Sequence, residues 1–294
     1  MKVTTEKLKM RVGGLVVSAL QEGLPGKLGA EPHFLPFLTE GEPDLELVFR
    51  RGRIMEERAL PVFDSGGVWR LFRHPDGKLR YDLSDALFGP EPYAQALVDP
   101  GHTEGEVRLR TLGGHERAGI LYPFVYPLDE LLAISLLSLR GGLHVHAAGI
   151  DDGGHGLLFP GISGAGKSTT SRLWREQPGV RVLSDDRTII RFHEGIPYLY
   201  GTPWHGEAEL STPGRARLAG VFFLRKAVEN RLTQLGPAEA AAELVARSFP
   251  AYWDREGVAS ALDAATRVTA AVPSFCLHFL PGVDAVDTVR EAFS

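Results

Sequence analysis

Cysteine is nearly absent from this chain of 294 residues, which contains only Cys276. A single cysteine excludes an intrachain disulfide and fits a reducing compartment. Because Cys276 lies in the strand-like run 274–280, we interpret it as a buried apolar side chain rather than a nucleophile. The fold must therefore be stabilised by an ordinary hydrophobic core.

Long hydrophobic runs are missing as well. The longest run, residues 131–139, ends at Arg140 and is shorter than the about 20 residues that a membrane helix needs. The apolar stretch 13–20 follows several lysines, but it is short for a signal peptide and no small-x-small cleavage site follows it. We therefore predict a strand there, a cytoplasmic location and no membrane association.

The chain also lacks an excess of positive charge. It has 32 Lys and Arg against 37 Asp and Glu, a net charge of −5, which argues against a general nucleic-acid-binding protein. The 44% of hydrophobic residues is ordinary for a globular chain and sufficient for a sizeable core. The length predicts about two domains. We place them at residues 1–122 and 123–294.

Short apolar runs separated by turn residues fill the first of these regions. Residues 15–20, 45–49, 68–72 and 107–112 are such runs, and residues 74–77 suit the tip of a hairpin with arms at 69–73 and 78–82. The pattern predicts a β-rich N-terminal domain. Its charged residues alternate with apolar ones, as on the solvated face of a sheet, and we find no catalytic constellation among them.

The second region alternates strands and helices. We expect helices near 128–139, 169–176, 237–248, 258–272 and 284–293, and strands near 143–150, 156–160, 180–186, 188–192, 197–200, 218–224 and 274–280. This order predicts an α/β fold with a mixed sheet.

Residues 161–168 have the spacing Gly, four residues, Gly-Lys-Ser, between a predicted strand and a predicted helix. Glycines let the backbone approach a polyphosphate, and exposed N–H groups and the helix start favour an anion. Lys167 suits the outer phosphates and Ser168 suits Mg²⁺. The alternative is a glycine-rich loop that matches by chance. The predicted nucleotide-binding residues are Gly161, Ser163, Gly164, Ala165, Gly166, Lys167, Ser168 and Thr169.

Two adjacent carboxylates, Asp185 and Asp186, follow the predicted strand after the loop helix. A phosphate-binding loop needs a carboxylate at the end of a neighbouring strand to hold Mg²⁺. Transfer to a hydroxyl also benefits from a carboxylate that takes the proton. Strand alternation sends neighbouring side chains to opposite faces, so a turn must bring both to one site. The alternative is an Asp-Asp turn that ends a strand.

The compact spacing of 18 positions between Lys167 and Asp185, with a hairpin before the loop, resembles the catalytic domain of HPr kinase/phosphorylase and its structural relatives, the phosphoenolpyruvate carboxykinases. Residues 146–150, 161–169 and 183–186 carry the resemblance, which covers about residues 125–294. It implies an HPr kinase-like P-loop fold, an ATP substrate and Mg²⁺. It also implies that Asp185 is the general base and Asp186 the metal partner, or the reverse.

The same resemblance implies that His146 lies near the reacting phosphate and takes part in catalysis. His144 would share its strand face, so the two histidines either form a metal pair or are satisfied groups on a half-buried strand. The Glu-Ile-Arg-Gly-Leu-Gly signature of HPr kinases is missing, and residues 200–207 take its place. There Glu207 is a candidate metal ligand and Trp204 or His205 a candidate contact, the alternative being a solvated loop.

We therefore predict a Mg²⁺-dependent kinase that transfers the γ-phosphoryl of ATP to a serine-like hydroxyl of a protein, peptide or small molecule. The N-terminal region does not resemble that of HPr kinases, so we expect an acceptor other than HPr, and we expect this region either to recognise the acceptor or to support assembly. The pattern resembles divergent HPr kinase-related proteins, some of them associated with modified-peptide clusters. HPr kinases assemble as hexamers, which leaves a homo-oligomer open.

Two other functions are compatible with parts of this pattern. A nucleotide-responsive binding module would need Lys167 and Ser168 but no base. A decarboxylating carboxykinase is disfavoured because the chain is short and has no second set of metal ligands. A kinase also needs positive charge near the moving phosphoryl group. The candidates downstream are Arg215, Arg217, Arg225, Lys226 and Arg231.

Overall fold

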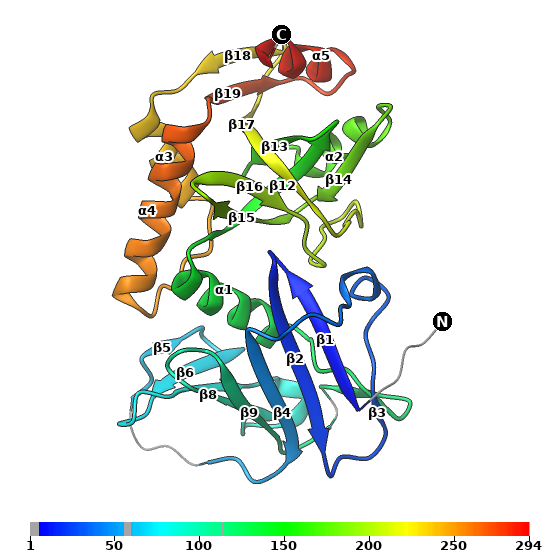
Figure 1. The fold of residues 1–294 in the computed structure, drawn as a ribbon, viewed down its shortest axis with the longest axis vertical. Coiled ribbons are helices and arrows are strands. Elements are labelled where there is room, and N and C mark those ends of the chain that lie inside the picture. The colour runs from blue at the N-terminus through cyan, green and yellow to red at the C-terminus, as the bar shows by residue number, and fades with distance from the viewer. Residues whose placement is uncertain (1–5, 56–59, 113, 294) are drawn as a thin grey trace. The chain divides into compact units, whose positions relative to one another are not determined.

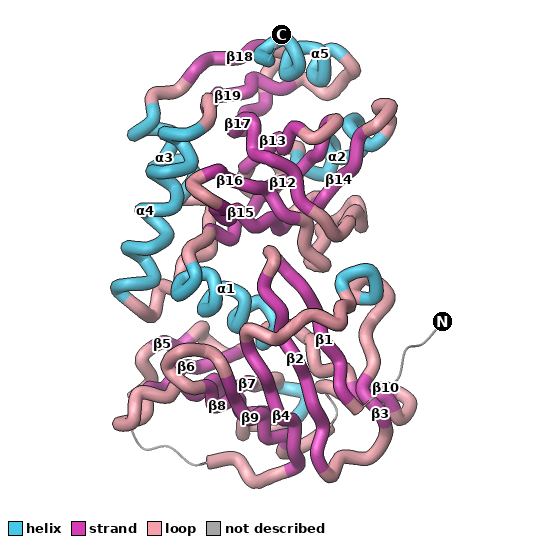
Figure 2. The backbone as a smooth tube through the Cα atoms, viewed as in Figure 1, coloured by secondary structure: helices cyan, strands magenta, loops and turns pink. Residues whose placement is uncertain are grey.

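A computed structural model of the chain describes residues 6–55, 60–112 and 114–293. The chain divides into two compact units, Met1–Leu136 and Leu137–Ser294, and the division falls within helix α1 (Leu128–Arg140). Each unit is built on an eight-stranded sheet with parallel and antiparallel pairs, and helices are few (Figure 2). The protein is therefore an α/β protein with mixed sheets.

The large sheet of the N-terminal unit has the strand order β1-β2-β4-β9-β8-β7-β6-β5 (Figure 1). Its strands β2, β4 and β9 run parallel, and the remaining neighbours pair antiparallel. A three-stranded sheet, β10-β11-β3, lies in the same unit. The elements are β1 (Lys7–Val12), β2 (Leu15–Glu22), β3 (Lys27–Leu28), β4 (Leu45–Arg51), β5 (Phe63–Asp64), β6 (Trp69–Arg73), β7 (Leu79–Leu83), β8 (Ala94–Val98), β9 (Glu104–Leu109), β10 (Glu116–Arg117), β11 (Ile120–Leu121) and the 3₁₀ helices Leu35–Phe37 and Ala86–Phe88.

The core of this unit lies on one face of the sheet. Leu71, Tyr81, Ala96 and Val107 stand opposite one another on four successive strands and are fully buried. Because side chains alternate between faces, their chain neighbours project to the opposite side. The Tyr81 hydroxyl lies 2.8 Å from the Ser135 Oγ, which ties α1 to the core face. The antiparallel pairing of β6 with β7 confirms the predicted hairpin.

The C-terminal unit contains a sheet of order β13-β12-β15-β16-β17-β19-β18, with β14 paired to β12. Because β13 also pairs with β17, five strands form a closed ring. The elements are β12 (Leu143–Asp152), β13 (His155–Pro160), α2 (Lys167–Arg175), β14 (Val180–Ser184), β15 (Arg187–His193), β16 (Ile196–Tyr200), β17 (Arg215–Lys226), β18 (Arg231–Gln234), α3 (Pro237–Val245), α4 (Arg255–Ala271), β19 (Ser274–Phe279), α5 (Asp284–Arg290) and the 3₁₀ helix Glu291–Phe293.

Two apolar layers cover the faces of this sheet. On one face, Val145 and Phe223 pack in a cluster with residues of α3 and α4 such as Leu244. On the other face, Ile150 and Phe159 belong to a cluster with Trp174 of α2 and residues of α5. Helix α2 therefore lies on the β12 face to which the even-numbered residues 146, 148 and 150 project.

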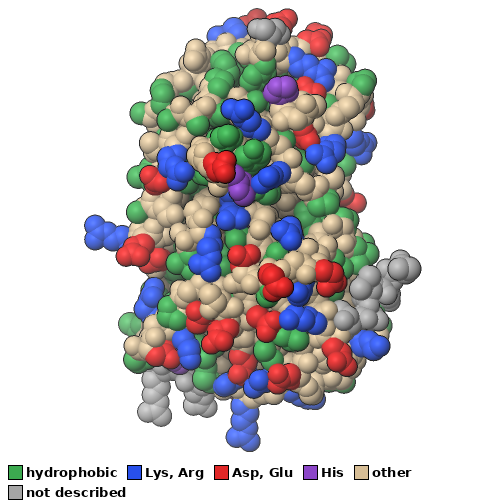
Figure 3. Space-filling model, viewed as in Figure 1, with side chains coloured by type: hydrophobic (Ala, Val, Ile, Leu, Met, Phe, Trp, Pro, Cys, Tyr) green, Lys and Arg blue, Asp and Glu red, His purple; other side chains and the backbone are tan. Residues whose placement is uncertain are grey.

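None of the helices within the described part of the chain is long and apolar enough to cross a membrane. Acidic and basic side chains are interspersed over the visible surface (Figure 3).

Candidate functional site

The glycine-rich loop 161–166 connects β13 to α2, as the sequence predicts. Gly164 and Gly166 have φ values of +75° and +113°, in the region that side chains with a Cβ rarely adopt. A Cβ on Gly166 would also stand 2.9 Å from the Phe279 ring. Gly166 is thus required for two reasons, its backbone conformation and its packing against β19.

Lys167 is the first residue of α2, and its side chain is buried beneath the loop. Its Nζ donates to the carbonyl oxygens of Gly161 at 3.0 Å and Ile162 at 3.3 Å. The same Nζ lies 3.8 Å from the Asp186 Oδ1. Burial lowers the pKa of Lys167, against the opposing influence of the Asp186 charge. The ammonium is therefore held between the loop and a carboxylate.

A turn stabilised by Ser184 sets the direction of Asp186. The Ser184 Oγ accepts hydrogen bonds from the backbone N–H groups of Asp186 and Arg187, at 3.3 Å and 3.1 Å. It donates to the Trp204 carbonyl at 3.1 Å. Such side-chain-to-backbone bonds compete with the sheet ladder, which is why β14 ends here.

The Asp186 carboxylate is the centre of a charged network. One oxygen lies 2.9 Å from the His146 Nε2, and the other accepts a hydrogen bond from the guanidinium of Arg187, which in turn stands over the Phe249 ring. Burial alone would raise the pKa of Asp186, but the hydrogen bond with His146 and the charge of Arg187 outweigh it, so the pKa lies below its usual value. Asp186 is therefore ionised at neutral pH.

Asp185 has a different environment from its neighbour. Its side chain is fully buried, and its two oxygens accept hydrogen bonds from the backbone N–H groups of Gly206 at 2.7 Å and Ala208 at 2.8 Å. The two adjacent carboxylates therefore have different hydrogen-bond partners. Asp186 reaches the loop, whereas Asp185 fixes the backbone of the segment 206–208.

The two histidines of β12 also differ. His146 is half-buried beside Asp186, but His144 is enclosed by the rings of Trp204 and Phe249, with centroids 5.2 Å and 5.1 Å away. Neither ring nitrogen of His144 has a hydrogen-bond partner in the described part of the protein. Burial lowers its pKa to about 3. His144 is thus a neutral packing residue beneath the network.

A cavity of about 420 Å³ opens above these groups. Of the predicted residues, Gly161, Ala165 and Asp185 do not line it, and Trp204 and His205 do not either. Sequence reasoning missed Arg172 and Gly206, although Arg172 follows Ser168 by four positions and so lies on the same side of α2. The lining residues are His146, Ser163, Gly164, Gly166, Lys167, Ser168, Thr169, Arg172, Asp186, Gly206 and Glu207.

The donors in this cavity suit a hard cation. Ser168 offers a hydroxyl oxygen, and Asp186 and Glu207 offer carboxylate oxygens, which are the ligands that Mg²⁺ prefers. Groups of three or more His, Cys, Asp or Glu side chains placed to hold a metal ion are absent from the described residues.

The cavity beside loop 161–168 is called the loop cavity below. It is not lined by any of the positively charged residues that the sequence suggested downstream, namely Arg215, Arg217, Arg225, Lys226 and Arg231. Arg225 pairs with Glu243 at 2.9 Å, and the guanidinium of Arg215 lies over the Tyr198 ring. Arg172, on α2, is the arginine that does line the cavity, and it reaches the Glu207 carbonyl at 3.5 Å.

Comparison with known proteins gives one family match. A family model described as SynChlorMet cassette protein ScmC matches residues 130–279. Among solved structures, the chain is similar to the Hpr(Ser) kinase/phosphatase from Coxiella burnetii, with a TM-score of 0.31 and 12% identity, over 51% of this chain and 92% of that one. The search of curated proteins yields no match.

Proposed function

The chain belongs to the family of SynChlorMet cassette protein ScmC, and we propose that the matched region, residues 130–279, is a kinase. This region contains every residue that lines the loop cavity. It transfers the γ-phosphoryl group of ATP to a serine-like hydroxyl of a protein, peptide or small molecule. The observation that carries the proposal is the convergence of loop 161–168, the Lys167 ammonium and the ionised Asp186 on one cavity, with 3.8 Å between the last two groups.

The loop and its lysine hold the triphosphate in this proposal. Backbone N–H groups of 164–168 and the start of α2 face the phosphates as an anion-binding nest. Lys167 exchanges its bonds to the Gly161 and Ile162 carbonyls for bonds to phosphate oxygens. Arg172 adds a second positive charge at the cavity wall. Such fixed cations stabilise the charge that develops on the transferred group.

Asp186 orients the acceptor and receives its proton. The acceptor oxygen forms a bond to the γ-phosphorus, the bond from that phosphorus to the bridging oxygen breaks, and ADP leaves with the electron pair. The hydroxyl proton passes to the Asp186 carboxylate, which His146 holds in place at 2.9 Å. An ionised carboxylate suits this role, because in phosphoryl transfer the catalytic carboxylate orients the acceptor hydroxyl and accepts its proton.

With Asp186 as the base, Mg²⁺ would be held by Ser168 together with Glu207, and it would neutralise charge on the phosphates. Of the two assignments that the sequence left open for the acids, the burial of Asp185 favours Asp186 as the base. Asp185 is then a positioning residue that keeps Gly206 and Glu207 at the cavity through its bonds to the N–H groups of Gly206 and Ala208.

The test is the transfer of labelled phosphoryl from ATP with a cell extract as the source of acceptor. Asp186→Asn should lower the rate of transfer by about 10²–10⁴-fold while nucleotide binding is kept, since a general base contributes that much. Asp185→Asn places an amide N–H₂ against a backbone donor and should cost about 1–3 kcal/mol of stability. Because it acts on the segment 206–208, its effect on transfer should be smaller than that of Asp186→Asn.

Two results would contradict the proposal. Unchanged transfer in Asp186→Asn would remove this residue from the mechanism. Tight binding of ATP by the wild-type chain with no labelled acceptor under any condition would favour a nucleotide-responsive binding module instead.

A further inference from the structure

A row of polar side chains crosses the N-terminal sheet on the face opposite its apolar core. Arg70, Asp82, Gln95 and Arg108 stand opposite one another on β6, β7, β8 and β9. Asp82 and Gln95 are nonetheless buried, at 4% and 1% exposure. This face is therefore not the solvated face that its charges suggest.

The chain after β4 covers part of this polar row. Gln95 fixes it there with both atoms of its side-chain amide: the Met55 N–H donates to Gln95 Oε1 at 2.7 Å, and Gln95 Nε2 donates to the Met55 carbonyl at 2.9 Å. The side-chain amide of Gln95 thus pairs with the backbone of Met55 through two hydrogen bonds, as a neighbouring strand would. The segment 52–55 becomes a fixed wall above the sheet.

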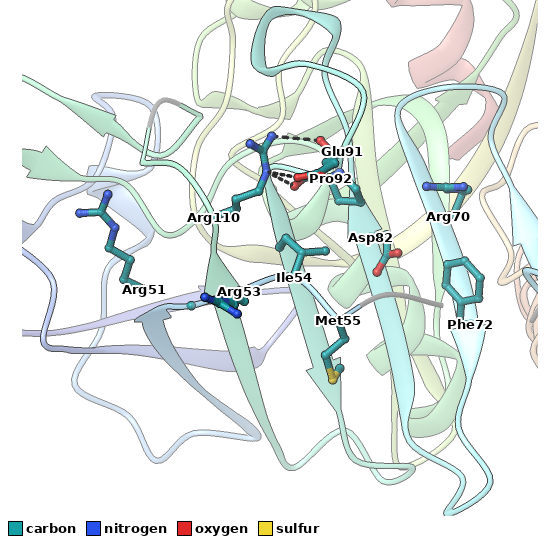
Figure 4. Close-up of a pocket in the computed structure, with 11 residues that line it drawn as sticks. Arg51, Arg53, Ile54, Met55, Arg70, Phe72, Asp82, Glu91, Pro92 and Arg110 are labelled. Carbon is teal, nitrogen blue, oxygen red and sulfur yellow. Dashed lines mark hydrogen bonds and ion pairs between the residues drawn. The ribbon is translucent and has the colours of Figure 1, made fainter. Parts of the chain in front are cut away.

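A cavity of about 620 Å³ lies between this wall and the sheet (Figure 4). Ile54, Met55, Phe72 and Pro92 give it an apolar lining. Its volume is within the range of about 300–1,000 Å³ that is typical of sites for small molecules. Four arginines and two carboxylates complete the lining, namely Arg51, Arg53, Arg70, Arg110, Asp82 and Glu91.

The carboxylate of Asp82 is already engaged, and Arg110 is held by carbonyl groups. Asp82 takes both hydrogen bonds from Arg80, at 2.9 Å and 3.2 Å, and this pair is buried. Arg110 donates to the carbonyls of Phe88 at 2.7 Å and Pro92 at 2.9 Å, and lies 3.7 Å from the Glu91 carboxylate, as Figure 4 shows in part. These groups form a fixed frame.

Positive charge remains after these pairs are made. Within the described residues, Arg51, Arg53 and Arg70 have no ion pair with a carboxylate. Arginine presents a planar set of donors that matches carboxylate and phosphate groups. We propose that this cavity binds a small organic anion that joins a carboxylate or phosphate group to an apolar part. This ligand site lies in a different unit from the loop cavity and does not depend on the kinase proposal.

The test is isothermal titration of the full chain with two anionic probes, octanoate and octyl phosphate, and two matched controls, octanamide and octylamine. The anions should bind and the controls should not. The tighter of the two anions identifies the favoured acidic group. Arg53→Gln combined with Arg70→Gln should weaken binding by about tenfold or more, because charge-assisted hydrogen bonds are lost.

Arg73→Gln is the matched control variant, because Arg73 lies on the same strand as Arg70 but projects from the opposite face. It should bind the anions as the wild type does. Circular dichroism of each variant establishes that it is folded, and the wild-type comparison of octanoate with octanamide needs no variant. Equal binding of octanamide, no binding of either anion at about 10 mM, or unchanged binding in a folded double variant would overturn the proposal.

Discussion

The two cavities of this protein are built in opposite ways. Most residues of the loop cavity come from one stretch, 163–172, and the fold brings four others to it, His146, Asp186, Gly206 and Glu207. The cavity lined by Arg51, Arg53, Arg70 and Arg110, the arginine cavity, takes its residues from five places between 51 and 110, which the strand register and the bonds of Gln95 to Met55 bring together. A site made by a local stretch can be recognised as a motif, whereas a site made by register cannot.

The first prediction concerns the pH dependence of stability and compares one buried histidine from each unit. Burial lowers the pKa of His115, in the N-terminal unit, to about 4 and that of His144 to about 3. Both folded values lie below the ordinary value of about 6.5, so the unfolded chain binds more protons at lower pH. The stability that each buried neutral histidine contributes to the fold is fully present above pH 6.5, and it is lost as the pH falls toward the histidine's folded pKa. Each should contribute a loss of about 2 kcal/mol between pH 7 and pH 5.

Urea unfolding at the two pH values measures this loss. His144→Phe replaces a ring that packs between Trp204 and Phe249 without a hydrogen-bond partner, and it should abolish the C-terminal share of the acid sensitivity. His155→Gln, at an exposed position, is the control and should keep it. An acid sensitivity that is the same in His144→Phe and in the wild type would show that His144 is not buried in its neutral form.

A second prediction separates the two glycines of the loop. Gly164→Ala meets no atom within 4 Å and should cost only the backbone strain, about 1–2 kcal/mol. Gly166→Ala adds an overlap with the Phe279 ring and should cost about 1–3 kcal/mol more. Thermal unfolding of both variants gives the difference. If the two variants are equally stable, the packing of β19 against the start of α2 is not as described.

The smallest expected effect is that of a double variant in the arginine cavity on phosphoryl transfer at the loop cavity, which should be unchanged. Arg53→Gln combined with Arg70→Gln changes half-buried or exposed side chains far in sequence from the loop, and it should change stability by no more than about 0.5 kcal/mol. Phosphoryl transfer to a small hydroxyl acceptor should stay at the wild-type rate. A transfer rate that falls in this variant would mean that the two cavities act on one substrate.

Much of the fold could be predicted from the sequence. The alternation of apolar residues and the turn residues at 74–77 identified the β6–β7 hairpin, and the helical pattern identified α1, α2 and α4. Among the strands that were not predicted are β1, β8 and β18. β8 carries a buried glutamine, Gln95, and β18 is an exposed edge strand, so neither shows the pattern of a core strand.

The candidate site could be predicted only in part. The loop lies between a strand and a helix as its spacing requires, but the sequence could not tell Asp185 from Asp186, because the turn that separates them depends on the Ser184 hydroxyl and on the distant Gly206. The arginine cavity was not found. Its side chains looked like a solvated sheet face, since nothing local indicates that the segment 52–55 folds over it.

The central claim is that loop 161–168, with Lys167, forms a site for Mg²⁺-ATP beside the Asp186 carboxylate. Its most direct test is calorimetric titration of the full chain with ATP in the presence of Mg²⁺, in parallel for Lys167→Ala and for the Arg53→Gln, Arg70→Gln double variant. The account predicts one binding site, weakened by about 10²-fold or more in Lys167→Ala and unchanged in the double variant. Absence of binding, or binding that survives in Lys167→Ala and is lost in the double variant, would contradict it.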